Sequence, residues 1–189
     1  MTGPAPPPSF HEEHVSAWCD WVLEHGLPDL PPELREAEAA PVAYARLGEW
    51  AAVMTLAYDP AEDPPELDMV IQTYHRTAGA WEAANGDSGS NWYPRTQLRR
   101  PPDLAPREVV ADGRGWFGEM GWVCSEVDGV AGVDAAAVEV EQAGRRHRQA
   151  LDSPIGAWVA AFDGRVAATV RVLDGAGAVL LERHCPSIL

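Results

Sequence analysis

The hydrophobic pattern of the chain opens with a helical period. Residues 11–25 place apolar side chains at spacings of three and four, which puts them on one face of an α-helix. Ser9 is the expected N-cap and Gly26 the expected C-cap. We therefore expect an amphipathic helix, followed at residues 31–39 by a short acidic helix or a turn. The stripe by which the helix is expected to dock consists of Val15, Trp18, Trp21 and Val22.

From residue 41 onward the pattern changes to short apolar segments of period two, separated by glycine, proline and aspartate. In residues 155–162 both alternating sets are apolar, so we expect this strand to be central. Asp163-Gly164, directly after it, is a strong hairpin signal. The expected strands are 42–46, 50–58, 67–76, 80–84, 108–111, 116–127, 135–142, 145–151, 155–162, 166–173 and 178–184.

This pattern of short apolar segments and turn residues predicts a mainly β fold. We expect an antiparallel β-sandwich or barrel of about 8–10 strands, with the amphipathic helix packed on it. Three regions follow from the pattern: a Pro-rich, disordered N-terminus at 1–10, an acidic helical segment at 11–40 and a β domain at 41–189. The C-terminal meander, 129–189, is compatible with an immunoglobulin-like subdomain.

The amino-acid composition indicates the cellular compartment that we expect and excludes some kinds of catalysis. The three cysteines are odd in number and far apart in the 189 residues, which favours reduced thiols in the cytoplasm over disulfides. The N-terminus lacks the features of a secretory signal, and no apolar run has the length of a membrane span. All fourteen basic residues are arginine, so lysine chemistry is excluded. We expect no cofactor and no membrane partner.

The charge of −15 is unevenly distributed. Residues 1–68 carry fourteen acids against Arg35 and Arg46, a net charge of −12, whereas residues 69–189 have a net charge of only −3. Such a field repels phosphate backbones, which disfavours a nucleic-acid partner. An acidic N-terminal region favours a partner protein with a basic surface.

One short motif suggests catalysis. Residues 86–90, Gly-Asp-Ser-Gly-Ser, differ by one letter from the nucleophile motif of trypsin-like serine proteases. In that family the motif follows the catalytic histidine and aspartate and lies late in the domain, whereas here it lies before the midpoint and no matching histidine motif precedes it. We therefore interpret residues 85–91 as a turn-rich loop, with Ser88 not a nucleophile.

Two further candidate sites are weak. His11 and His14 are three residues apart rather than four, and residues near a chain end are more often an exposed polar turn than a zinc site. The same glycine-rich loop is not followed by the helix that a phosphate cradle requires. We predict no metal site and no catalytic residue.

Arginines gather in residues 95–114 and 145–148. They can bind an anionic ligand or pair with the chain's own acidic N-terminal segment, and self-pairing is the simpler hypothesis. The function we predict is that of a non-catalytic cytoplasmic interaction protein, such as a regulator, an accessory factor or an acidic inhibitor of a basic protein. Its expected partner-binding residues are Glu12, Glu13, Asp20, Glu33, Glu36, Glu38, Trp92 and Tyr93.

The alternative is a β-barrel or sandwich that binds a small molecule, with a cyclase- or isomerase-type enzyme as one form of it. An enclosed cavity lined by aromatic side chains would favour this alternative, and a filled core with an acidic face would favour the interaction protein. The pocket residues that the alternative predicts are His75, Trp81, Trp92, Arg95, Arg99 and Trp116.

Overall fold

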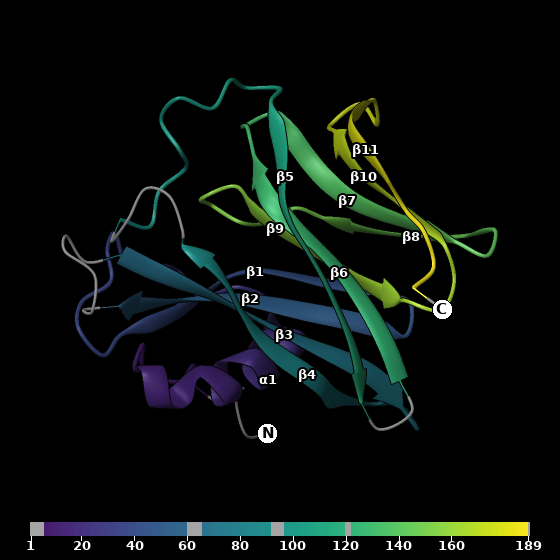
Figure 1. Cartoon of the computed structure of the whole chain (residues 1–189). Helices are drawn as coiled ribbons and strands as arrows, with labels where there is room; N and C mark the ends of the chain where they lie inside the picture. The colour runs from purple at the N-terminus through teal and green to yellow at the C-terminus, as the bar shows by residue number, and fades with distance from the viewer. Residues whose placement is uncertain (1–5, 60–65, 92–96, 120–121, 189) are drawn as a thin grey trace, which may run out of the picture.

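The chain folds into a mainly β structure with one short helix near its N-terminus (Figure 1). The computed structural model describes residues 6–59, 66–91, 97–119 and 122–188. A 3₁₀ turn at Glu12–His14 precedes the helix α1, Val15–His25. The strands are β1 (Ala39–Leu47), β2 (Trp50–Asp59), β3 (Glu66–Thr77), β4 (Ala80–Asn91), β5 (Val109–Glu119), β6 (Trp122–Ala131), β7 (Ala135–Gln142), β8 (Arg145–Ala150), β9 (Ala157–Asp163), β10 (Ala168–Asp174) and β11 (Val179–Cys185).

The strands of the described residues form three antiparallel sheets. One sheet has the order β1-β2-β3-β4, a second has the order β11-β10-β7-β8, and a third has the order β5-β6-β9. Gln149 joins the first two, since its side-chain oxygen accepts the Arg46 N–H at 2.6 Å and its amide donates to the Tyr44 carbonyl at 3.0 Å. The side chain of Gln149, on β8, thus forms hydrogen bonds with backbone groups of the edge strand β1.

Strand β9 lies at the centre of the packing, as its two apolar faces predict. Ala157, Val159 and Ala161 belong to the core that faces β1–β3. Trp158 and Phe162 belong to the core that faces β7 and β10. Because both faces of β9 are covered, almost every side chain of this strand is removed from water.

Helix α1 packs on the outer face of the β1–β4 sheet, the face opposite β9 (Figure 1). Trp18 and Val22 are fully buried against Val53 and Tyr74, which confirms the expected docking stripe. Gly26 ends the helix as predicted, with φ +87° and its N–H donated to the Val22 carbonyl. At the other end the N-cap prediction was wrong: a 3₁₀ turn precedes the helix, and His14, not Ser9, is the N-cap.

Two predicted segments differ from the structure. The expected single strand 116–127 is divided between β5 and β6, which pair as a hairpin, and residues 108–111 belong largely to the start of β5. Residues 85–91, expected to be a loop, lie in β4, where Ser88 is opposite Val70. Of the short helix or turn expected at residues 31–39, the turn is present: an extended segment is followed by a turn that leads into β1.

Candidate functional site

The N-terminal acids that the sequence suggests for partner binding are mostly exposed. Asp20 lies on the solvent side of α1, Glu12 precedes the helix, and Glu33 and Glu36 lie between α1 and β1. Glu38 is different, because its carboxylate accepts the Arg35 N–H at 2.9 Å and closes the turn before β1. The Glu13 side chain, Trp92 and Tyr93 lie outside the part of the chain that can be described.

Acids of the C-terminal sheet are held in ion pairs. Arg171 on β10 contacts three carboxylates: Glu139 at 3.2 Å, Glu141 at 2.7 Å and Glu182 at 2.6 Å. These contacts lower the pKa of Glu141 and raise that of the Arg171 guanidinium. Arg146 adds a contact of 3.1 Å to Glu141.

In the ranges that the structure describes, no salt bridge joins an N-terminal acid to an arginine. Arg107, in the first arginine cluster, pairs with Asp174 at 3.1 Å. Arg107 therefore pairs within the C-terminal part of the chain, and the pairing of the other arginines with the acidic N-terminal segment stays a prediction. Burial and the charge of Glu24, one helical turn away, raise the pKa of Asp20.

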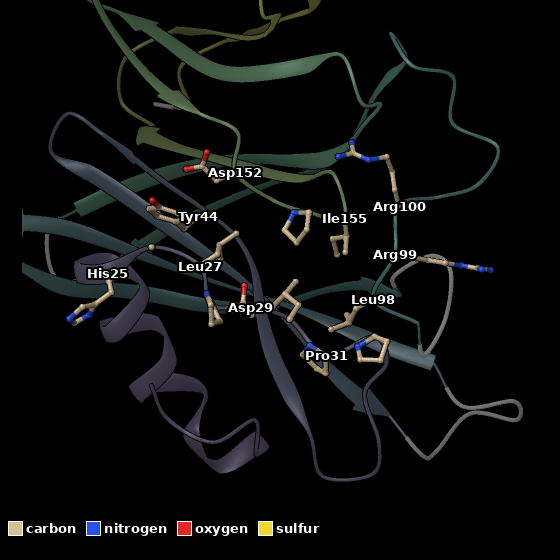
Figure 2. A pocket seen from close by; sticks show the side chains of 15 residues that line it. His25, Leu27, Asp29, Pro31, Tyr44, Leu98, Arg99, Arg100, Asp152 and Ile155 are labelled. Carbon is tan, nitrogen blue, oxygen red and sulfur yellow. The ribbon is translucent and has the colours of Figure 1, made fainter. Parts of the chain in front are cut away.

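A groove of about 830 Å³ lies beside this acidic region (Figure 2). Its lining is mixed, polar and apolar, and Asp29, Arg99 and Asp152 are exposed, so it opens to solvent. Asp152 and Tyr44 lie toward one end of the view in Figure 2, and Arg99 and Arg100 lie toward the other. The apolar lining residues are Leu27, Pro28, Leu30, Pro31, Pro32, Leu98, Pro154 and Ile155.

Local backbone pairing positions one wall of the groove. The segment that follows Gly26 runs extended, and the Pro32 carbonyl accepts the Leu98 N–H at 3.0 Å. One residue further, Glu33 and Gln97 form an isolated antiparallel bridge. The prolines of this segment have a fixed φ, so the wall has little conformational freedom to lose when a ligand binds.

Arg100 is part of the framework of the groove. Its guanidinium donates to the Ala131 carbonyl, and burial lowers its pKa. Gly156 makes this contact possible, because a Cβ there would lie 2.4 Å from the Arg100 Nη1 and 2.3 Å from the Ala131 oxygen. Arg99, in contrast, is exposed at the rim and forms no salt bridge within the described residues.

The residues of the predicted small-molecule pocket do not share one site. Arg99 lines the groove, whereas His75 lines a different hollow beside Trp50. Trp81 packs near α1, and the Arg76 guanidinium lies 5.7 Å from its ring centroid. These three described residues therefore lie at different places on the fold. Trp92 and Arg95 lie outside the described residues, and of Trp116 only the backbone, in β5, is described.

The cysteines of the described residues are buried and form no disulfide with one another: Cys19, Cys124 and Cys185. Burial raises the pKa of Cys19 to about 11 and that of Cys124 to about 12, so neither thiol is ionised at neutral pH. The Ser9 hydroxyl lies 2.9 Å from His14 Nδ1. No cluster of three metal-ligating side chains was found among the described residues.

Sequence reasoning missed the groove because its walls come from residues 25–32, 98–100 and 152–155, three loops that are far apart along the chain. The prolines before β1 were the one local signal. Comparisons with models of known protein families, with curated proteins and with solved structures found no match. No helix in the described ranges has the length and apolar character needed to cross a membrane.

Proposed function

We propose that the protein is a non-catalytic interaction protein that binds a basic, extended segment of a partner in the groove beside its acidic N-terminal region. The observation that carries this proposal is the contrast in charge pairing. The N-terminal acids Glu12, Asp20, Asp29, Glu33 and Glu36 are exposed and form no salt bridge within the described ranges, whereas the acids of β7 and β11 are ion-paired.

The filled core also favours a partner that binds at the surface over a small molecule enclosed in the fold. Side chains of β1, β2, β3 and β9 fill the space between the sheets that the described residues border. The internal space beside Trp158 measures about 10 Å³, close to the room for a single water molecule. The Trp158 indole N–H is buried there without a hydrogen-bond partner, so one water is the occupant that fits.

The groove has the chemistry for an extended peptide. Apolar side chains from three loops supply contact area, and Asp29 and Asp152 at the rim supply two carboxylates that can bind arginine or lysine. Both aspartates are exposed, so their attraction for a free cation is screened, and it becomes stronger only when the partner excludes water.

A displayed library of random peptides, selected on the purified protein, tests the proposal. We expect the enriched peptides to carry arginine or lysine beside apolar residues, and to bind more weakly as salt rises. The double variant Asp29→Asn, Asp152→Asn should reduce their affinity by about tenfold or more, the size of one or two lost charge-assisted contacts.

Asp134→Asn is the matched control, because Asp134 is equally exposed but lies outside the groove. This variant should bind the peptides as tightly as the unchanged protein. Enrichment of acidic peptides, enrichment of none, or equal losses in the double variant and the control would overturn the proposal.

A further inference from the structure

A second hollow, of about 410 Å³, lies at the other end of strand β9 from the groove. Ile155, just before β9, lines the groove, whereas Phe162 and Asp163 at the end of β9 line the hollow. The turns between β1 and β2 and between β7 and β8 lie at this same end of the molecule (Figure 1). Turns that are gathered at one end of a rigid β framework are a common place for binding sites.

The floor of the hollow is aromatic. Trp50 is 6% exposed and Phe162 is 2% exposed, so the framework holds both rings firmly. The ring of His75, on β3, lies edge-on to Trp50 with the centroids 4.8 Å apart and the planes at 69°. A flat ring in the hollow would meet aromatic faces and edges, the arrangement that aromatic pairs prefer.

His147 forms a wall through a close approach to the β1–β2 turn. A Cβ at Gly48 would lie 2.9 Å from the His147 Nε2, and Gly48 has φ +70°, so both the space and the backbone conformation require glycine. The His147 side chain is half-buried, and its imidazole forms no hydrogen bond with the described residues. It is available to donate to a ligand.

Other polar groups of the hollow are already engaged. The Gln142 amide donates to the carbonyls of Asp163 and Val166, both at 2.7 Å, and so fixes two walls together. The Asp163 carboxylate is held by Arg165, which donates to it at 2.7 and 2.9 Å. Asp163 is therefore a poor site for a ligand cation.

Arg145 and Glu49 are the two charged groups at the rim that form no salt bridge among the described residues, and both are exposed. Arg145 lies on β8 one residue before Arg146, so the two guanidinium groups leave the strand on opposite faces. Arg146 contacts Glu141, on the face away from the hollow. Guanidinium and imidazole groups together favour a carboxylate.

We propose that this hollow binds a small aromatic carboxylate, with its ring on Trp50 and Phe162 and its carboxylate toward Arg145 and His147. A volume of about 410 Å³ falls within the range typical of small-ligand sites. This site is separate from the groove of the proposed function, and neither proposal depends on the other.

The test uses the full chain labelled with ¹⁵N, with indole-3-carboxylate and its neutral counterpart indole-3-carboxamide as probes. We expect the carboxylate to shift amide resonances around the hollow in a saturable way, and the carboxamide to bind about tenfold more weakly, the size of one charge-assisted contact. No saturable shift at millimolar carboxylate, or equal binding of the two probes, would overturn the proposal.

Neighbouring variants make the test specific. Arg145→Ala should weaken carboxylate binding by about tenfold, whereas Arg146→Ala, its matched control, should leave it unchanged. Glu49→Gln should tighten binding, because it removes the negative charge at the rim, and a gain of affinity cannot result from misfolding. Equal effects of the two arginine variants, or no gain in Glu49→Gln, would contradict the proposed orientation.

Discussion

The N-terminal region and the C-terminal sheet of this protein differ in whether their carboxylates form ion pairs. In the C-terminal sheet a single arginine, Arg171, forms ion pairs with three carboxylates on the two neighbouring strands. In the N-terminal region, where residues 1–68 carry a net charge of −12, Glu12, Asp20, Asp29, Glu33 and Glu36 form no salt bridge within the described ranges. Helix α1 is thus held by apolar packing and by hydrogen bonds such as that from the Arg46 guanidinium to the Leu23 carbonyl, rather than by ion pairs of these acids.

Buried apolar side chains hold the acidic N-terminal segment on the β1–β4 sheet. Trp18 and Val22 are fully buried on the β1–β4 sheet, and Phe10 stacks on Trp18 with the ring centroids 4.9 Å apart. The Trp18 indole donates to the Ser9 carbonyl at 2.9 Å, so its one polar group is satisfied. Burial of this kind is insensitive to salt, unlike surface ion pairs.

The largest effect should come from removing that anchor. Trp18→Ala deletes a fully buried aromatic side chain and is expected to lower the free energy of unfolding by about 3–5 kcal/mol, measured by urea denaturation. Trp21→Ala, at a half-buried position one turn along, should cost clearly less. Equal losses, or a loss under about 1 kcal/mol for Trp18→Ala, would mean that packing does not fix the helix.

Arg171→Ala should have the next largest effect. It leaves three carboxylates close together without their shared cation, and we expect a loss of about 1–2 kcal/mol at neutral pH, reduced from the value for buried pairs because solvent reaches the site. Arg146→Ala breaks one exposed pair and should change the stability little. A larger effect of Arg146→Ala would contradict the assignment of Arg171 as the centre of the network.

The two regions should also respond to pH with opposite signs. The N–H groups of Ala178 and Ala176, with Arg107, lower the pKa of Asp174 below its ordinary 3.8, so Asp174 stabilises the fold above pH 3.8 and loses this effect as the pH falls through the lowered value. The pKa of Asp20 is raised, so its contribution is complete below pH 3.8 and is lost as the pH rises through the raised value.

Asp20→Asn should therefore stabilise the protein at pH 7, by no more than about 0.5 kcal/mol because the side chain is exposed. Asp174→Asn should destabilise it at pH 7 and make the stability less sensitive to acid. Urea midpoints at pH 7 and pH 3 measure both effects. The same sign for the two variants at pH 7 would refute the contrast between the regions.

The smallest effect is expected for the exposed N-terminal acids. The triple variant Glu12→Gln, Glu33→Gln, Glu36→Gln should change the free energy of unfolding by less than about 0.5 kcal/mol, because these side chains form no salt bridge within the described ranges. A decrease of the free energy of unfolding by more than about 1 kcal/mol would show that these carboxylates stabilise the fold, which would contradict the proposed partner-binding role.

The sequence by itself determined the features that depend on near neighbours. The three-and-four spacing of Trp18 and Val22 predicted the helix and its buried face, since a helix repeats every 3.6 residues. The doubly apolar segment at 155–162 predicted the central strand β9. The hairpin predicted at Asp163-Gly164 was wrong: the chain turns there, but β9 pairs with β6, whereas β10 pairs with β7 and β11 in another sheet. Where such signals were weak, prediction failed: residues 116–127 contain no strong turn pair, and the β5–β6 hairpin was read as one strand.

Only the tertiary structure decided which side chains meet. His75 and Arg99 were assigned to one pocket, yet His75 lines the hollow beside Trp50. Arg99 lines the groove at the other end of β9, where its neighbour Leu98 pairs with the segment that follows α1. Likewise, Arg171 pairs with acids on the two adjacent strands of the C-terminal sheet, a set of partners that the sequence did not indicate. The reason is geometric: an ion pair forms between side chains a few ångströms apart, and strand register and sheet stacking, which involve residues far apart along the chain, set those distances.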